Sequence, residues 1–175
     1  MNGLDLRSVD EDDLPQVAAL HAAAFTASAH GHHGEADLVR ALHEAGDARV
    51  SLGAWRDDAL VGHVLFSRMT AQADGAPIAA AALAPLAVAR HWRRRGIGAA
   101  LVAAGHAALR AQGTGLAFVL GDPAYYGRLG YEAALAAPFA SPYAGPFFMA
   151  CALDSAAPRP QRGEAIHAPA FSRLA

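Results

Sequence analysis

Residues 83–101 read LAPLAVARHWRRRGIGAAL, and the expected fold is built outward from this stretch. Its first half continues an apolar run that contains Pro85, and its second half opens a helix predicted over residues 97–112. Pro85 argues against a helix in the first half, because a helix interior does not tolerate proline whereas a strand can carry it at a bulge. The stretch therefore predicts a strand over residues 77–89, then a loop, then a helix.

Glycine and arginine gather where the strand passes into the helix. Gly96 and Gly98 allow successive backbone N–H groups to point into one concavity, and the helix N-terminus adds its positive dipole end. The neighbouring run Arg93–Arg95 adds positive charge. The pattern favours a pyrophosphate site that is neither a Walker A loop nor a dinucleotide fingerprint, since the GK[ST] ending and the third glycine are absent. A tight turn followed by a solvated basic run is the alternative.

The rest of the chain alternates helical and strand patterns. Strands are predicted over residues 4–9, 49–55, 59–69, 116–120 and 147–153, and helices over residues 14–25, 35–45 and 123–130. This succession predicts a mixed α/β (α+β) fold in a single domain over residues 1–154. Residues 155–175 show no periodicity and are predicted to form a loosely ordered tail.

Composition excludes several classes of protein. With 54% hydrophobic and 17% charged residues and a net charge of −2, the chain of 175 residues is too apolar for disorder and argues against a basic nucleic-acid module. One cysteine excludes an internal disulfide and fits a reducing cytoplasm. The acidic N-terminus does not resemble a signal peptide, and no apolar run is long enough to cross a bilayer. A cytoplasmic protein is expected, with neither nucleic acid nor membrane as partner.

Two motifs carry a resemblance to a known family. Residues 86–101 closely resemble the acetyl-CoA-binding motif of the GNAT N-acetyltransferase superfamily, whose loop pattern Q/R-x-x-G-x-G/A is matched by Arg93, Gly96 and Gly98. Residues 121–131, GDPAYYGRLGY, resemble the family's second motif, and this form is similar to the YhbS-like bacterial acetyltransferases. The resemblance implies a mostly antiparallel mixed sheet that splays between strands 4 and 5 and is flanked by about four helices.

The resemblance also implies a cofactor site for acetyl-CoA, used as a co-substrate without a metal. The pantetheine arm would enter the gap at the Pro85 bulge, and the Val88 N–H would polarise the thioester carbonyl. The residues that would bind the cofactor are Leu86, Ala87, Val88, Arg93, Arg94, Arg95, Gly96, Ile97, Gly98, Ala99 and Tyr126.

Acetyl transfer to an amine needs an acid and a base. By resemblance Tyr126 is the acid that protonates the departing thiolate, whereas Tyr125 is expected to pack in the core or to contact substrate. Glu35 is the candidate base, because it shares the inward stripe of the second helix. A carboxylate that only complements the helix dipole is the alternative for Glu35, and His63 or water could take the same proton.

The sequence identifies neither the acceptor amine nor the oligomeric state. A small-molecule or peptide amine is the expected acceptor, and a homodimer is possible. The run His30–His33 is interpreted as an acceptor-site loop in preference to a metal site, and Cys151 as a core residue. Two rival functions are a non-catalytic acyl-CoA-binding domain of the same fold and a nucleic-acid module that uses the arginine run.

Overall fold

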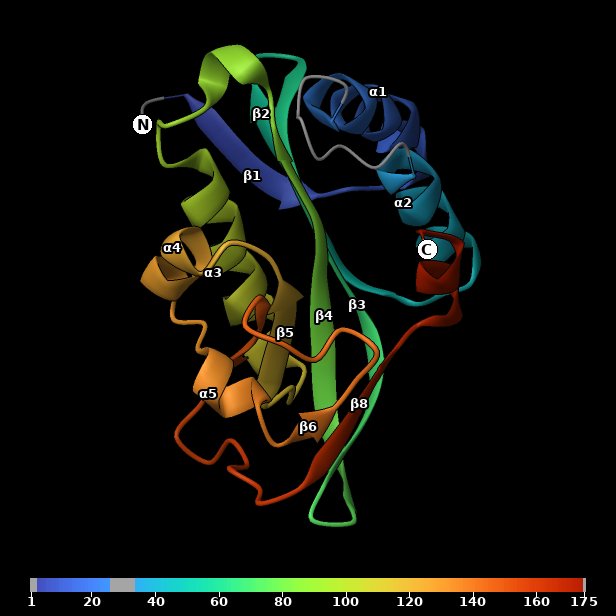
Figure 1. The fold of residues 1–175 in the computed structure, drawn as a ribbon. Helices are drawn as coiled ribbons and strands as arrows, with labels where there is room; N and C mark the ends of the chain where they lie inside the picture. Colours follow the sequence, from blue (N-terminus) through green and yellow to red (C-terminus); the bar gives the residue numbers. More distant parts are fainter. Residues whose placement is uncertain (1–2, 26–33, 175) are drawn as a thin grey trace.

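The computed structural model describes residues 3–25 and 34–174 (Figure 1). The strands are β1 (Leu4–Ser8), β2 (Ala48–Arg56), β3 (Ala59–Ala73), β4 (Ala76–Val88), β5 (Leu116–Leu120), β6 (Phe139–Ala140), β7 (Phe148–Ala152) and β8 (Gly163–His167). The α-helices are α1 (Leu14–Phe25), α2 (Glu35–Glu44), α3 (Ile97–Ala111), α4 (Pro123–Tyr126) and α5 (Ala133–Ala136). Short 3-10 turns include η2 (Arg90–Trp92), η3 (Gly127–Leu129) and η4 (Pro169–Leu174).

One mixed sheet organises the molecule. Its strand order is β1-β2-β3-β4-β5-β7, with β8 paired to β3 and β6 paired to β8. The β4–β5 and β6–β8 pairs are parallel and the others are antiparallel. The prediction of a mostly antiparallel mixed sheet is confirmed. The described chain has five α-helices where about four were predicted, because α5 is too short to leave a periodic signal.

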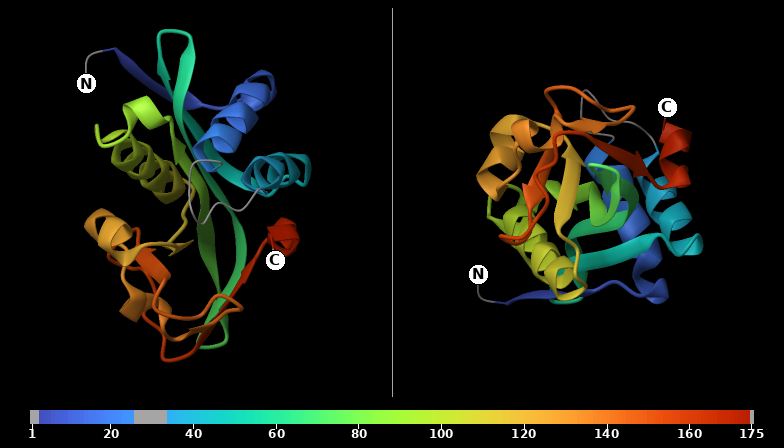
Figure 2. Two further views of the ribbon diagram at one scale, coloured as in Figure 1. Left: turned by 45° about the horizontal axis from the view of Figure 1, so that its top comes forward. Right: turned by 90° about the horizontal axis from the view of Figure 1, so that it is seen from below.

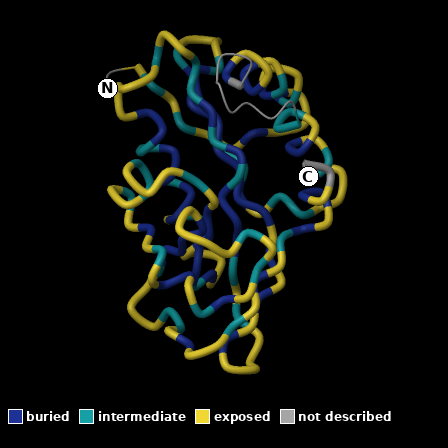
Figure 3. Tube along the Cα trace, viewed as in Figure 1, coloured by how far each residue is buried: buried dark blue, intermediate teal, exposed yellow. Residues whose placement is uncertain are grey.

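Helices cover the sheet on two faces. Figure 2 shows α1 and α2 on one face and α3 on the other. Each face has its own core: Leu42 and Phe118 belong to the cluster under α2, and Leu101 and Phe66 to the cluster under α3. The buried segments in Figure 3 run along the central strands between these layers. No helix of the described chain is long and apolar enough to cross a membrane.

A bulge in β4 confirms the prediction made from Pro85. Val64 of β3 pairs with Leu86 and Phe66 with Leu83, so one residue of β3 faces two of β4. The extra residue reverses the alternation of side chains. Before the bulge Leu83 faces α3, and after it Leu86 faces α3, whereas Ala87 packs against α1.

The same bulge marks the place where β4 and β5 part. Their parallel ladder joins only Ala80–Leu83 to Leu116–Val119, so β4 continues beyond Leu83 without β5 beside it. The two parallel strands therefore open at one end of the sheet, next to the N-terminus of α3 (Figure 1).

Helix α3 lies unusually close to the sheet at Gly105. A Cβ added there would come within 2.2 Å of the ring of Phe66, which is fully buried. Gly105→Ala gains about 1 kcal/mol of helix propensity, but overpacking costs about 1–3 kcal/mol. We expect a net loss of stability of up to about 2 kcal/mol, measured by urea denaturation. In a Phe66→Leu background the substitution should be nearly neutral, and an equal loss there would disprove the contact.

The prediction of a loosely ordered tail is wrong for residues 163–174. Gly163–His167 forms β8, which pairs with Met69–Ala73 of β3. The 3-10 turn Pro169–Leu174 follows, and Phe171 is buried in the α2-side core. Five residues with a single buried alanine at the centre carry too little hydrophobic pattern to identify a strand. The pairing depends on the length of β3, which extends past the predicted end at Met69.

Candidate active site

A cavity of about 890 Å³ lies where β4 and β5 part. Its walls come from the end of β4, the loop before α3, the first turn of α3, and the α4–η3 segment. The lining residues are Ala24, Leu86, Ala87, Val88, Trp92, Arg93, Arg94, Gly96, Ile97, Gly98, Ala99, Tyr125, Tyr126, Arg128 and Leu129. The structure thus brings together every residue predicted for the cofactor site except Arg95.

The backbone of β4 beyond the bulge turns polar groups into this gap. Ala89 N–H donates to the carbonyl of Val61. Because hydrogen-bonded pairs alternate along an antiparallel ladder, the backbone N–H and C=O of Ala87 also face β3, toward its partner His63. By the same alternation Leu86 and Val88 direct their backbone groups away from β3. The carbonyl of Val88 accepts a hydrogen bond from Arg93 Nε at 3.1 Å on that side. The Val88 N–H therefore points toward the opening.

The loop before α3 has the backbone shape of an anion site. Arg94 and Gly96 have φ angles of +60° and +80°, which curl the chain into the first turn of α3. No side chain caps this helix, so the N–H groups of its first turn face the cavity together with the positive end of the dipole. Positive φ at an arginine costs about 1 kcal/mol and is typical of functional loops.

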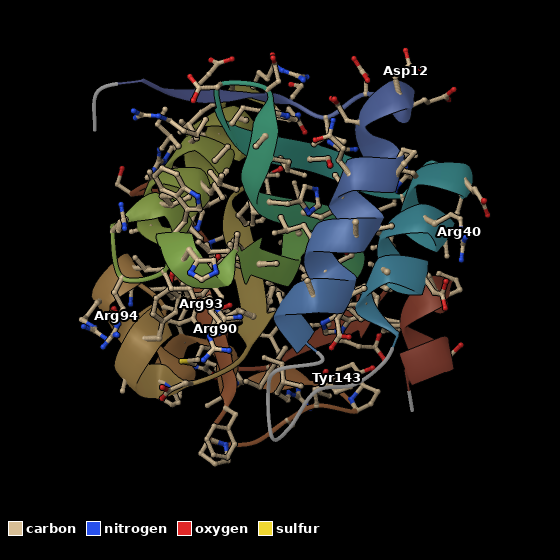
Figure 4. The ribbon with its side chains drawn as sticks, turned by 90° about the horizontal axis from the view of Figure 1, so that it is seen from above. Asp12, Arg40, Arg90, Arg93, Arg94 and Tyr143 are labelled. Atoms are coloured by element: carbon tan, nitrogen blue, oxygen red, sulfur yellow. The ribbon has the colours of Figure 1, made fainter. Side chains whose placement is uncertain are left out.

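The three arginines of the run do different things. Arg93 donates to the carbonyls of Val88 and Ala24 at 3.1 Å each, which joins the end of β4 to the end of α1. Arg94 lines the cavity. Arg95 lies over the ring of Trp92 with 4.9 Å between guanidinium and ring centre, and its side chain does not line the cavity. In Figure 4 Arg90, Arg93 and Arg94 lie on the flank near α4, opposite Arg40.

Loss of the Arg93 bridge has a measurable cost. Arg93→Ala leaves two carbonyls without their donor, and because this guanidinium is exposed we expect destabilisation of only about 1–2 kcal/mol in urea unfolding. Arg90→Ala is the matched control, because Arg90 is an exposed arginine of the same loop, and the expected change is within about 0.5 kcal/mol. Equal losses in the two variants would contradict the bridging role of Arg93.

Two adjacent tyrosines of α4 enter the cavity in different ways. A Cβ added to Gly98 would come within 2.5 Å of Tyr125 Oη, so the Tyr125 hydroxyl lies over the first turn of α3. The Tyr126 ring lies against the backbone of Gly121, where an added Cβ would be 2.4 Å from the ring. The rings of Tyr125 and Tyr126 meet edge to face at 5.0 Å. Tyr125 is therefore half-buried and lines the cavity. Of the two roles predicted for it, core packing does not hold, and substrate contact stays a prediction.

The Tyr126 phenol is held in its neutral form. Burial, and then the neighbouring Tyr125, raise the pKa of Tyr126 well above its ordinary value. Its ring packs edge to face on Tyr131 at 5.7 Å, and the Tyr131 hydroxyl is in turn 2.9 Å from His106 Nε2. A phenol with a raised pKa stays a proton donor throughout the neutral range.

Sequence reasoning missed Arg128 as a residue of the site. Its Nε donates to the carbonyl of Ala124 at 2.8 Å, and its side chain lines the cavity beside Tyr125. The nearby charge of Arg128 lowers the pKa of Tyr125, although burial outweighs it and the net shift is upward. The signal was available, because Arg128 follows Tyr125 by three residues and so lies on the same face of a helical turn.

The candidate bases lie away from the cavity lining. Glu35 is the half-buried first residue of α2. His63 is fully buried in β3, next to Ala87 across the ladder. The run His30–His33 lies outside the described residues. Among the residues described, no three His, Cys, Asp or Glu side chains gather as metal ligands would. Cys151 is buried in the α3-side core, as predicted.

The chain is similar to proteins of one enzyme family. Residues 5–134 match the family model described as acetyltransferase (GNAT) domain. The chain is 37% identical over 125 residues to YjhQ of Escherichia coli K12, named as an uncharacterized N-acetyltransferase, covering 70% of this chain and 66% of that one. It is 36% identical over 123 residues to YhbS of the same organism, an uncharacterized N-acetyltransferase, covering 70% of each chain.

Solved structures show the same fold over nearly the whole chain. YhbS of Escherichia coli in complex with CoA has a TM-score of 0.86 and 28% identity, covering 98% of this chain and 93% of that one. A GNAT family acetyltransferase of Brucella melitensis in complex with acetyl-CoA has a TM-score of 0.81 and 27% identity, covering 98% and 99%. Together with the sequence matches, these likenesses show that the chain belongs to the GNAT family of acetyltransferases.

Proposed function

We propose that the chain is an acetyl-CoA-dependent N-acetyltransferase, in which a primary amine attacks the thioester directly in a ternary complex. The observation that carries the proposal is the Val88 N–H, which faces a gap in the sheet beside the uncapped N-terminus of α3. One site thus combines a donor for a thioester carbonyl with a receptor for phosphates. The CoA and acetyl-CoA complexes of the related structures support this assignment.

Different walls of the cavity would bind the pyrophosphate and the pantetheine arm of acetyl-CoA. The first turn of α3, with Gly96, Gly98 and Ala99, would bind the pyrophosphate through backbone N–H groups. Arg94 and Arg128 would add positive charge at the cavity wall. Leu86 and Val88 would bind the pantetheine amides as an added strand would, because their backbone groups face the gap.

Chemistry would take place beside Val88. As the amine attacks, negative charge develops on the thioester oxygen, and a backbone donor aimed at it stabilises that charge by about 3 kcal/mol. The C–S bond then breaks, and the Tyr126 hydroxyl donates its proton to the thiolate. The amine nitrogen loses a proton to restore Tyr126, which leaves an amide and a neutral thiol.

An ammonium must lose one further proton before it can attack. Glu35 is proposed as a carboxylate base at the start of α2, and His63 or water remain the competing candidates. The acceptor is proposed to be a small-molecule or peptide amine, since direct attack requires no nucleophile from the protein.

Calorimetric titration tests the cofactor, and a panel of amines tests the reaction. We expect micromolar binding of acetyl-CoA, and a mass increase of one acetyl group on at least one amine. Absence of acetyl-CoA binding by the folded chain would overturn the proposal. Binding without transfer to any amine of a broad panel would instead show a non-catalytic acyl-CoA-binding domain.

A further inference from the structure

Four polar side chains form a continuous hydrogen-bonded line inside the protein. His21 Nε2 of α1 is 2.8 Å from His63 Nδ1 of β3, and His63 Nε2 is 3.0 Å from the hydroxyl of Ser51 of β2. The Ser51 hydroxyl is 3.2 Å from His43 Nε2 of α2. We call these four residues the imidazole–hydroxyl chain. It crosses the layer between the sheet and the helices α1 and α2.

The inner half of the imidazole–hydroxyl chain is buried, and none of its four residues is a carboxylate. His21 and His63 have no exposed surface, and His43 is partly buried. Burying polar groups is costly unless each is hydrogen-bonded, and apolar side chains would fill this core at lower cost. A line of groups that each both donate and accept is, however, the arrangement that can pass a proton.

One end of the imidazole–hydroxyl chain lies directly behind the cavity. His63 pairs with Ala87 across the β3–β4 ladder, so both side chains lie on the α1 face of the sheet. Ala87 lines the cavity, and so does Ala24, which is three residues beyond His21 on α1. The other end is different: His43 and Ser51 line a separate hollow of about 340 Å³ near Gly46. The imidazole–hydroxyl chain therefore joins the wall of the active-site cavity to a second surface.

Two proton arrangements satisfy the same three hydrogen bonds. In the first, His21 donates to His63, His63 to Ser51, and Ser51 to His43; in the second, every donor and acceptor is exchanged. A proton added to His21 in the first arrangement converts it to the second when three protons shift along the line. One proton enters at His21, one leaves from His43, and the charge within the core is unchanged. Before the next turnover the four groups must reorient to restore the first arrangement.

We propose that the imidazole–hydroxyl chain carries the proton released by the acceptor ammonium from the active site to solvent at His43. The inference rests on the proposed acetyltransferase function. Amide formation from an ammonium and a thioester yields an amide, a thiol and one proton, and this proton has to leave a largely apolar cavity. His21 is fully buried and does not itself line the cavity, so ordered water between the amine and His21 would have to pass the proton to the imidazole–hydroxyl chain.

The charges around the chain favour outward movement. Burial lowers the pKa of His21 to about 4, and burial together with its two histidine neighbours lowers the pKa of His63 well below the ordinary value. His43 is also lowered by burial, but Glu11 partly offsets this. A positive charge is therefore least costly at the outer end. Because His21 and His63 are weak bases, no net charge is expected to rest on them, and the protons along the line have to shift together.

Ser51→Ala tests the proposal by removing the central hydroxyl. We expect kcat to fall about 10–100-fold with the fastest amine of the panel, an altered pH profile, and an unchanged Kd for acetyl-CoA. Ser51→Thr keeps the hydroxyl and should restore both kcat and the profile. Ser67→Ala is the matched control, because Ser67 is buried in β3 and its hydroxyl has no hydrogen-bond partner among the described residues.

Several outcomes would overturn the proposal. Equal kcat values and equal pH profiles for Ser51→Ala and Ser67→Ala would show that the imidazole–hydroxyl chain is purely structural, even if both variants melt at a lower temperature than wild type. A loss confined to Glu35→Gln, with Asp37→Asn as its control, would assign the proton to Glu35. The calorimetric titration with acetyl-CoA tests the proposed function separately. A wild type that binds no acetyl-CoA would refute that function itself.

An acceptor-free measurement supplements the kinetics. Long-range proton–nitrogen NMR spectra should show the His63 ring nitrogens averaged between two tautomers in wild type and Ser51→Thr, and a single tautomer in Ser51→Ala. Acetyl-CoA should shift the His63 signals. A single His63 tautomer in wild type that acetyl-CoA does not perturb would contradict the relay.

Discussion

A chain carrying Gly98→Trp is expected to bind acetyl-CoA at least about 100-fold more weakly than wild type, a loss of about 3 kcal/mol. Gly98 lies in the first turn of α3, where even a Cβ would be 2.5 Å from Tyr125 Oη and within 4 Å of Val88 and Leu86. An indole at this position would occupy the space over the helix N-terminus. The N–H donors and the positive dipole end would then be closed to a pyrophosphate.

Calorimetry with three ligands makes this prediction specific. Acetyl-CoA, desulfo-CoA and adenosine diphosphate should all lose affinity, because they share the pyrophosphate. Ala107→Trp places the same side chain on the exposed face of the same helix and should leave all three affinities within about twofold. If Gly98→Trp melts like wild type and still binds acetyl-CoA at wild-type strength, the phosphate site lies elsewhere.

Tyr126→Phe should lower kcat about 100–1000-fold and leave the Kd of acetyl-CoA within about threefold of wild type. The substitution removes only the hydroxyl, and the ring packing on Gly121 and Tyr131 is kept. The departing thiolate would then have to take its proton from water. Steady-state kinetics with the fastest amine, together with calorimetry, separates the two effects.

The neighbouring tyrosine supplies the control. Tyr125→Phe keeps the Tyr126 hydroxyl and should lower kcat less than about tenfold, with the larger change in the Kd of acetyl-CoA. Because the pKa of Tyr126 is raised, its proton is present throughout the neutral range, and wild-type kcat should not fall through loss of that proton below about pH 10. A larger kcat loss in Tyr125→Phe than in Tyr126→Phe would reassign the acid to Tyr125.

Local chemistry explains which elements could be predicted. The predicted strand over residues 116–120 coincides with β5, and the helix predicted over 97–112 differs from α3 by one residue. Both have strong apolar patterns and clear ends at glycine. The bulge at Pro85 was also predictable, because proline restricts where a ladder can be regular. In contrast, β8 has little pattern of its own and exists because β3 is long enough to pair with it.

The residues of the candidate site also divide into those that the sequence could predict and those that it could not. The loop Arg93–Gly98 could be recognised because its proposed phosphate-binding role would be carried by backbone groups that the glycine spacing exposes. The separate uses of Arg93, Arg94 and Arg95 could not, because three identical side chains in a row differ only in what the fold places beside them. Arg128, in contrast, could have been found from the sequence, because it follows Tyr125 by three residues and lies on the same face of a helical turn.

By itself, the sequence determined the strand–loop–helix, the bulge and the tyrosine pair, since each depends on contacts between residues close in the chain. Only the tertiary structure decided that Tyr125 reaches Gly98, that Arg93 joins α1 to β4, and that His21, His63, Ser51 and His43 form one line. Those four residues come from four separate elements. No periodicity records their meeting, because it depends on how two helices pack on the sheet rather than on any local preference of the backbone.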